Sequence, residues 1–175
     1  MAEGIAVKHP GGKTLPIIRE LVDDVVCVSE SEIEHAIALY FNVEKTVAEG
    51  AGAASLAALL AYRDRFAGKR TGVVLSGGNI DARLMAMVIM RGLIRDGQLA
   101  RIRVETADVP GQLARVATVI ASCQGNIVEI EHQRLLADVA LKSADLDITV
   151  ETRDLEHIGE IMAALGEAGF AAELL

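Results

Sequence analysis

The order of hydrophobic patterns over residues 98–175 is the feature that most restricts the fold of this chain. Apolar residues alternate with polar ones where strands are expected, and they recur every three or four positions where helices are expected. The predicted strands cover residues 101–106, 127–130, 141–152 and 170–175, and the predicted helices begin near Leu113 and after Asp154. The order strand, helix, strand, strand, helix, strand predicts a ferredoxin-like βαββαβ domain.

Residues 1–97 show a different pattern, in which short apolar runs alternate with helical periodicity. The runs at 25–28 and 71–75 predict buried strands. Helices are predicted from Pro16, Glu49 and Asp81, and another from Ser29, which forms a capping box with Glu32. The alternation indicates an α/β layer, but it contains too few strands for a complete domain of that class.

Charge changes abruptly in the middle of the chain. Residues 1–97 hold eleven Lys or Arg and twelve Asp or Glu, a balance of -1. Residues 98–175 hold six Lys or Arg and thirteen Asp or Glu, a balance of -7. The net charge of the whole chain is therefore -8. Gly97 follows the predicted helix that ends near Arg95, as is common at a helix end. We therefore predict two domains, 1–97 and 98–175.

Composition excludes several classes of protein. Hydrophobic residues make up 51% of the chain, too many for a disordered protein, and a pI near 5.0 leaves no excess of cations to bind nucleic acid. The mean hydropathy is high at +0.35, but the longest stretch without charge, residues 50–62, has thirteen residues. A membrane span needs about 20 apolar residues, and the first residues lack the apolar core of a signal peptide. The sequence thus predicts a soluble chain without membrane or nucleic-acid partners.

Cysteine and histidine usage indicates neither a disulfide framework nor a metal site. Cys27 and Cys123 lie 96 positions apart, each beside apolar residues, and both are predicted to be reduced and buried. Reduced cysteines are typical of the cytoplasm. The histidines have no metal-ligand spacing and are predicted to be structural or to lie at the surface: His9, His35, His132 and His157.

Two segments of the first half have the residue types of a ligand site. Ser76-Gly77-Gly78-Asn79 lies between a predicted strand and a predicted helix, where α/β proteins bind ligands. Paired glycines let a backbone approach a ligand, although a tight turn without a function uses the same residues. Glu49 is the acidic residue in a stretch that otherwise consists of small and apolar residues. It is either a functional acid or a stabilising charge at a helix N-terminus.

Four motifs in a fixed order carry a family resemblance. They are AEGIAVK at 2–8, PIIRELVDD at 16–24, EGAGAA at 49–54 and VLSGGNI at 74–80. Together they resemble the C-terminal part of the catalytic domain of threonine dehydratase (threonine ammonia-lyase), a pyridoxal-phosphate enzyme of fold type II. The resemblance continues through DVPG at 108–111, which is similar to the opening of the ACT regulatory domain of the catabolic-type enzyme.

The resemblance implies that residues of the first half bind pyridoxal phosphate. The hydroxyl group of Ser76 would hydrogen-bond the pyridine nitrogen and leave the ring unprotonated, which suits β-elimination. Gly4 would pass close to the cofactor, and Glu49 would lie near the ring, with Gly77 and Asn79 in the same site. Full-length relatives convert L-threonine to 2-oxobutanoate and ammonia, and often L-serine to pyruvate as well.

Two parts of the family's cofactor site have no counterpart in this sequence. The Schiff-base lysine of the family lies in a Ser-x-x-Lys-x-Arg-Gly context, and the cofactor phosphate binds a Gly-rich loop. None of this chain's lysines has that context: Lys8, Lys13, Lys45, Lys69 and Lys142. Because this chemistry needs an amine nucleophile at the aldehyde, we expect the chain alone to be inactive, to bind no cofactor and to be part of a longer enzyme.

The second half resembles a domain that pairs with a copy of itself and binds an amino acid. The resemblance implies an effector site in which one copy contributes Asp108, Gly111, Gln112 and Leu113, and another contributes Asn126 and Ile127. Backbone N–H groups at a helix start suit a carboxylate, although Pro-Gly is also ordinary turn chemistry. Alternating, half-exposed strands predict a homodimer. The alternative to an enzyme segment is a stand-alone ACT-type module for amino-acid binding or dimerisation.

Overall fold

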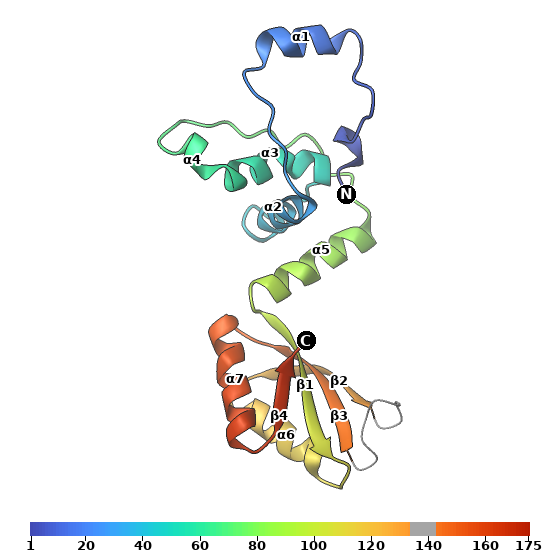
Figure 1. The fold of residues 1–175 in the computed structure, drawn as a ribbon, viewed down its shortest axis with the longest axis vertical. Coiled ribbons are helices and arrows are strands. Elements are labelled where there is room, and N and C mark those ends of the chain that lie inside the picture. The colour runs from blue at the N-terminus through green and yellow to red at the C-terminus, as the bar shows by residue number, and fades with distance from the viewer. Residues whose placement is uncertain (134–142) are drawn as a thin grey trace. The chain divides into compact units, whose positions relative to one another are not determined.

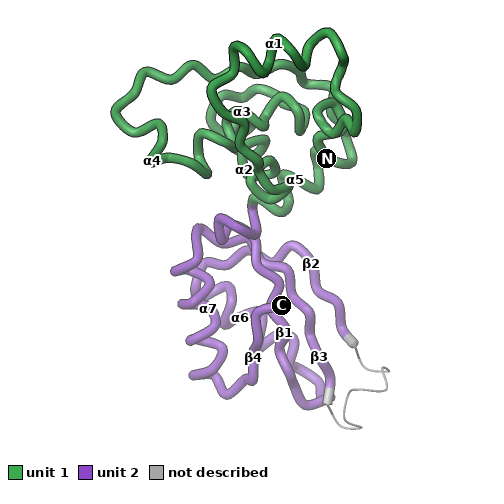
Figure 2. Tube along the Cα trace, turned by 45° about the horizontal axis from the view of Figure 1, so that its top comes forward, with its two compact units in different colours: residues 1–92 green, residues 93–175 purple. Residues whose placement is uncertain are grey.

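The computed structural model describes residues 1–133 and 143–175 and divides into two compact units, residues 1–92 and 93–175 (Figure 2). Lys142 and the first two residues of the strand predicted at 141–152 lie outside the described residues. Across the described parts of the chain, no helix is both long enough and apolar enough to cross a membrane.

Unit 1 is built from helices joined by extended segments (Figure 1). These are the 3-10 helix η1 (Glu3–Ile5), α1 (Thr14–Leu21), α2 (Glu30–Asn42), α3 (Gly50–Ala61), α4 (Arg63–Phe66) and α5 (Ala82–Arg95), the last of which runs on into unit 2. The capping box that begins α2 is confirmed. The Ser29 hydroxyl accepts a hydrogen bond from the Glu32 backbone N–H at 3.2 Å, and the Glu32 carboxylate accepts one from the Ser29 N–H at 2.6 Å.

The core of unit 1 lies where α2 packs against α3. Ile37, Ala53 and Ala57 are fully buried there, and Val88 of α5 joins them. The small residues of α3 let the two helix backbones approach closely, so the tightly packed helix predicted after Glu49 is confirmed.

The strands predicted at 25–28 and 71–75 do not form, and both segments are extended chain without a ladder. Side chains hold them instead: the Tyr62 hydroxyl donates to the Cys27 carbonyl at 2.8 Å, and the Ser55 hydroxyl donates to the Val74 carbonyl at 2.7 Å. A strand requires a neighbouring backbone with which to exchange hydrogen bonds. The one sheet among the described residues belongs to unit 2, so these segments have no such neighbour.

Much of the apolar surface of unit 1 is exposed. Val25 is 74% exposed and Val74 is 73% exposed, and on α1 the predicted apolar stripe that includes Leu21 also faces outward. The prediction of a buried Cys27 is wrong, because this cysteine lies in the extended segment and is exposed. Cys123 is half-buried and packs against the core of unit 2.

Unit 2 has the predicted ferredoxin-like arrangement. Its elements are β1 (Leu99–Ala107), α6 (Gln112–Ser122), β2 (Asn126–Gln133), β3 (Ser143–Glu151), α7 (Leu155–Glu167) and β4 (Ala171–Leu174). The strands form an antiparallel sheet in the order β2-β3-β1-β4, and α6 and α7 cover one face (Figure 1). Alternate residues of the central strands, such as Ile102 and Ile148, are fully buried against Ile120 of α6 and Ile161 of α7.

The start of α7 is fixed by side chains. The carboxylate of Asp154 accepts a hydrogen bond from the His157 backbone N–H at 2.9 Å, which confirms the predicted cap. The ring of His157 is 1% exposed, and its Nδ1 accepts from the Arg153 N–H at 3.1 Å. Since Nδ1 is an acceptor, Nε2 carries the hydrogen and donates it to the Cys123 carbonyl, 2.7 Å away. His157 thus joins α7 to the end of α6, as a structural histidine.

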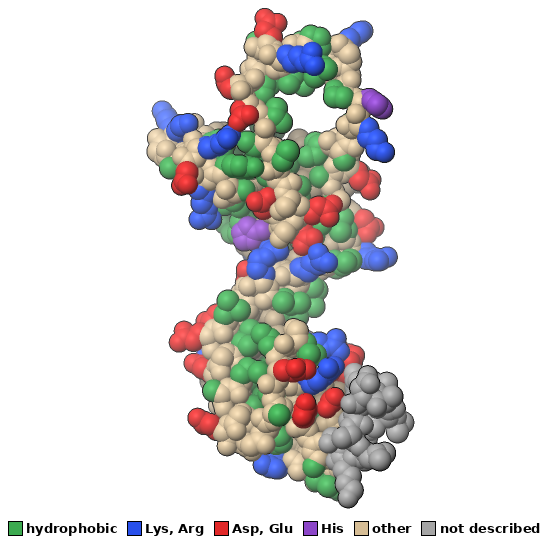
Figure 3. All heavy atoms as spheres, in the orientation of Figure 1, with side chains coloured by type: hydrophobic (Ala, Val, Ile, Leu, Met, Phe, Trp, Pro, Cys, Tyr) green, Lys and Arg blue, Asp and Glu red, His purple; other side chains and the backbone are tan. Residues whose placement is uncertain are grey.

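The other face of the sheet carries charge rather than apolar side chains. Arg101 bridges Glu131 of β2, at 2.6 Å, and Asp147 of β3, at 3.4 Å. Arg103 pairs with the same Asp147 at 2.7 Å and lies 3.7 Å from Glu173 of β4. Basic and acidic side chains lie side by side over this part of unit 2 in Figure 3. These pairs connect all four strands across the open face.

Candidate functional site

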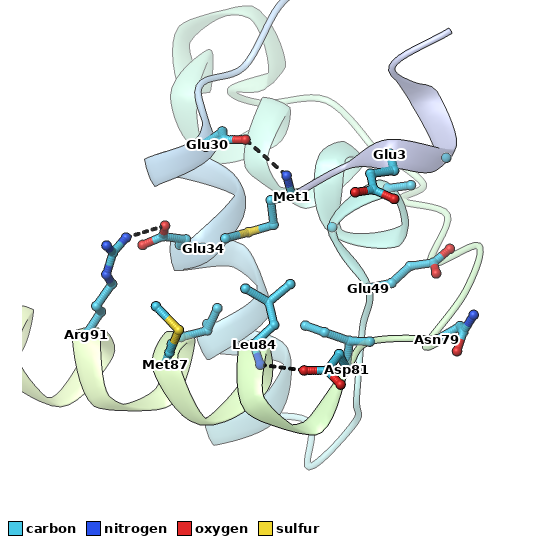
Figure 4. Close-up of a pocket in the computed structure, with 15 residues that line it drawn as sticks. Met1, Glu3, Glu30, Glu34, Glu49, Asn79, Asp81, Leu84, Met87 and Arg91 are labelled. Carbon is cyan, nitrogen blue, oxygen red and sulfur yellow. Dashed lines mark hydrogen bonds and ion pairs between the residues drawn. The ribbon is translucent and has the colours of Figure 1, made fainter.

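A cavity of about 670 Å³ lies in unit 1 and is lined by η1, α2, α3, α5 and the segment before α5; we call it the unit 1 cavity. Three of the predicted cofactor residues, Gly4, Glu49 and Asn79, line it. In the close-up of Figure 4, Glu49 and Asn79 lie on one side of the cavity, and Arg91 and Glu34 on the other. The structure therefore brings together residues that are 75 positions apart in the sequence.

The Ser-Gly-Gly-Asn turn packs directly against the start of α3. The Glu49 backbone N–H donates to the Gly77 carbonyl at 3.0 Å. A Cβ atom added to Gly77 would lie 2.6 Å from Oε1 of Glu49, and one added to Gly52 would lie 2.5 Å from the Gly77 carbonyl oxygen. These glycines are thus required by close contact between the turn and the helix. That contact holds the Glu49 carboxylate beside the turn.

Glu49 and Ser76 differ in how well they match their predicted roles. Glu49 is the N-cap residue of α3, yet its side chain makes no capping hydrogen bond there; it lines the cavity on the same side as Asn79 (Figure 4). Ser76 is exposed and does not line the cavity. Of the five predicted cofactor residues, three share the cavity, Gly77 joins them through Glu49, and Ser76 lies outside the cavity lining.

The far wall of the unit 1 cavity holds a charge pair that sequence reasoning missed. Nη1 of Arg91 on α5 lies 2.7 Å from Oε1 of Glu34 on α2, and the Glu34 side chain is 9% exposed. Asp81 accepts hydrogen bonds from the backbone N–H groups of Arg83 and Leu84, which confirms it as the cap of α5. No local motif connects Glu34 to Arg91, because they are 57 positions apart and meet only when α2 and α5 pack together.

A smaller cavity of about 130 Å³ lies beneath the turn between β1 and α6; we call it the turn cavity. All four predicted effector residues of this segment line it, namely Asp108, Gly111, Gln112 and Leu113. Gly111 has a φ of +92° and precedes α6, whose first turn has neither an acidic residue nor a side-chain cap. Among the described residues, no side chain caps the backbone N–H groups at the start of α6, and such groups suit an acceptor on a ligand.

The other two predicted effector residues lie at the opposite end of the sheet. Asn126 is paired in register with Glu151 and donates to its carboxylate at 2.7 Å, and Ile127 follows it. The turn cavity is at the end where Ala107 pairs with Ser143. One copy of the chain therefore does not bring the two halves of this site together. His132, predicted to be structural or at the surface, is exposed and also lines the turn cavity.

Within the described residues, no cluster of three or more His, Cys, Asp or Glu side chains is arranged to hold a metal ion.

Comparison with known proteins assigns both parts of the chain. Residues 1–77 match the family described as pyridoxal-phosphate dependent enzyme, and residues 96–168 match the ACT domain. Residues 1–77 thus match a segment of pyridoxal-phosphate dependent enzymes, and residues 96–168 match an ACT domain. The resemblance carried by the four motifs and the DVPG turn is thereby confirmed, as is the α/β class followed by a ferredoxin-like domain.

Threonine-deaminating enzymes are among the relatives of this chain. The L-threonine ammonia-lyase of Geobacter sulfurreducens is 45% identical over all 175 residues, which cover 44% of that protein, and that of Thermotoga maritima is 35% identical, with 43% covered. The catabolic L-threonine dehydratase TdcB of Escherichia coli is 47% identical over 83 residues, 46% of this chain and 25% of that protein. The pyridoxal-phosphate enzyme segment and ACT domain thus span less than half the length of these relatives.

Proposed function

We propose that this chain is the C-terminal part of a cytoplasmic lyase that uses pyridoxal phosphate to convert L-threonine to 2-oxobutanoate and ammonia. Residues 1–97 belong to its catalytic domain, and residues 98–175 form its ACT-like regulatory domain. The observation that carries the proposal is the 45% identity to an L-threonine ammonia-lyase, which extends over both parts of the chain.

The residues of unit 1 fit one side of such a cofactor site. Gly4 and Glu49 line the unit 1 cavity, and the close contact between Glu49 and Gly77 holds the Glu49 carboxylate beside the Ser-Gly-Gly-Asn turn. When bound, pyridoxal phosphate supplies an electron sink for the charge left on the substrate α carbon. In this proposal the exposed Ser76 hydroxyl donates a hydrogen bond to the pyridine nitrogen, and Glu49 and Asn79 orient the ring and the substrate from the cavity wall.

The chain alone is proposed to be inactive. None of its lysines lies in the sequence context of the family's Schiff-base lysine, and covalent chemistry of this kind needs that amine. We expect the purified chain mixed with pyridoxal phosphate to show neither a Schiff-base absorbance band nor release of 2-oxobutanoate from L-threonine. Turnover by the chain alone would contradict this part of the proposal.

Activity is tested by joining this chain to the preceding part of the Geobacter sulfurreducens relative. The chimera is expected to deaminate L-threonine. In its Ser76→Ala variant, kcat should fall by up to about tenfold, because the variant lacks a hydrogen bond to the ring. Ser31→Ala, an exposed serine on α2, is the matched control and should leave kcat unchanged. A chimera that binds the cofactor and acts on L-threo-3-hydroxyaspartate but not on L-threonine would overturn the proposed substrate.

We further propose that the ACT domain regulates this activity as a homodimer that binds a small amino acid. The edge strand β2 is eight residues long, with Val128 56% exposed, and exposed edges pair readily with another strand. Antiparallel pairing of two β2 strands brings Asn126 and Ile127 of one copy to the end of the sheet where the other copy has its turn cavity. A dimer therefore supplies what a single copy lacks.

Dimerisation is tested by light scattering on the whole chain. The wild-type chain is expected to be a dimer, and Val128→Lys should make it a monomer by placing a charge on the pairing edge. Leu174→Lys, on the opposite edge strand β4, is the control and should leave the dimer intact. A wild-type monomer at high concentration would contradict the proposal.

The alternative is a stand-alone ACT-type module. It is favoured by one observation, namely that unit 2 has a complete sheet and its own buried core. The two functions are separated by the chimera: an inactive chimera together with an amino-acid-binding dimer of the present chain would support the module.

A further inference from the structure

Among the described residues, the turn cavity is lined by three strands, the turn after β1 and the start of α6. Thr106 comes from the end of β1, Asp108 and Leu113 from the turn and the start of α6, and Leu146 from β3. His132 comes from β2, which is separated from β1 and the turn by β3 in the sheet. A ligand in this cavity would thus be enclosed by three strands and a helix start.

The register of the sheet determines which way His132 faces. Ile130 pairs with the fully buried Ile148, so its side chain is on the helix-covered face. Glu131 points to the opposite face, where it bonds Arg101. His132 therefore returns to the helix-covered side, paired in register with Leu146, and is exposed at the cavity rather than packed in the core.

The lining combines three kinds of chemistry. The uncapped start of α6 and the imidazole of His132 provide hydrogen-bond donors that suit a carboxylate. Asp108 provides a carboxylate that suits an ammonium group, and Leu113 and Leu146 provide apolar surface. A volume of about 130 Å³ is well below the 300–1,000 Å³ typical of ligand pockets, so the ligand must be small.

We propose that His132 donates a hydrogen bond to the carboxylate of a small aliphatic amino acid in the turn cavity and thereby selects for that carboxylate. This inference rests on the proposed regulatory function of the ACT domain. The His132 contact comes from the end of β2 in the same copy as the turn. It is additional to the contacts expected from Asn126 and Ile127 at the start of β2 in a second copy.

The test is calorimetric titration of the whole 175-residue chain with L-valine, with L-valinamide, which lacks the carboxylate, and with L-phenylalanine, which is larger. The wild-type chain is expected to bind L-valine at least about tenfold more tightly than either of the others. His132→Leu should weaken L-valine binding about tenfold and L-valinamide binding clearly less, because a neutral amide oxygen accepts a weaker hydrogen bond than a carboxylate does. His132→Gln, which retains a donor, should recover part of the loss, and His9→Leu, exposed in unit 1, is the control.

The outcomes separate this inference from the function on which it rests. If no amino acid binds the wild-type chain, the proposed effector function fails and the inference with it. A second outcome is that L-valine binds the wild-type chain and binds Asp108→Asn more weakly, while His132→Leu leaves the affinity unchanged. In that case the effector site is supported and the inference about His132 is overturned. Equal losses of L-valine and L-valinamide binding in His132→Leu would also overturn it, because they would indicate a structural role. Thermal melting of each variant checks that it is folded.

Discussion

Asp147 of β3 accepts two hydrogen bonds from the guanidinium group of Arg103 on β1, at 2.7 and 2.8 Å. The Asp147 side chain is 2% exposed although it lies on the open face of the sheet, because Arg101 and Arg103 cover it. The hydrogen bonds from Arg103 hold the pKa of Asp147 below its ordinary value, against the opposing effect of burial. This carboxylate is the centre of the charge pairs that connect the four strands.

Removing the Asp147 carboxylate should destabilise unit 2. Asp147→Ala leaves two guanidinium groups without their shared partner. We expect the free energy of unfolding to fall by about 1–2 kcal/mol, a modest loss because the arginines are partly exposed and water screens them. Urea unfolding measures the change. Glu105→Gln, an exposed acid on the same face, is the control and should change the midpoint little.

The same pair makes the stability of unit 2 sensitive to acid. A carboxylate with a lowered pKa in the folded state stabilises the fold above its unfolded pKa, and this contribution is lost as the pH falls through the folded pKa. For Asp147 the loss begins below its ordinary pKa of 3.8 and is completed at lower pH. The stability difference between the wild-type chain and Asp147→Asn should therefore be constant from pH 5 to 7 and shrink below about pH 4. A difference that grows as the pH falls would contradict this assignment.

Two glycine-to-alanine substitutions in helices should have opposite signs. Alanine is favoured over glycine in a helix by about 1 kcal/mol. At Gly159 of α7 nothing lies within 4 Å of an added Cβ, so Gly159→Ala should raise the melting temperature. At Gly52 of α3 the Cβ would lie 2.5 Å from the Gly77 carbonyl oxygen, and the backbone must move. Gly52→Ala should therefore destabilise unit 1 by about 1–3 kcal/mol, measured by thermal or urea unfolding.

His157 should be required for the stability of unit 2 but not for any ligand contact. His157→Leu leaves the Cys123 carbonyl and the Arg153 N–H without their buried partner. An unsatisfied buried polar group costs about 1–3 kcal/mol, so unfolding should occur at clearly lower urea concentration. His9→Leu is the exposed control. An unchanged midpoint for His157→Leu would show that water replaces both hydrogen bonds.

Sequence patterns correctly predicted the structural features that depend on residues close together in the chain. The capping box of Ser29 and Glu32 and the cap at Asp154 each depend on residues within three positions, and both are present in the structure. The β-α-β-β-α-β order of unit 2 was predicted because each strand and helix has one buried face that its own sequence pattern reveals. The strands predicted at 25–28 and 71–75 were wrong for a related reason: an apolar run indicates burial, but a strand also needs a partner, and Val25 and Val74 are exposed.

The sequence by itself indicated the family and the fold of the second half, and it singled out Gly4, Glu49 and Asn79 in the unit 1 cavity and the turn residues of the turn cavity. Tertiary structure alone decided which of those residues meet. It placed Glu49 against Gly77, it separated Asn126 from the turn at Gly111 by the length of the sheet, and it brought His132 to the turn cavity instead. The physical reason is that periodicity and capping act over a few residues, whereas strand register and helix packing determine contacts between residues far apart in the chain.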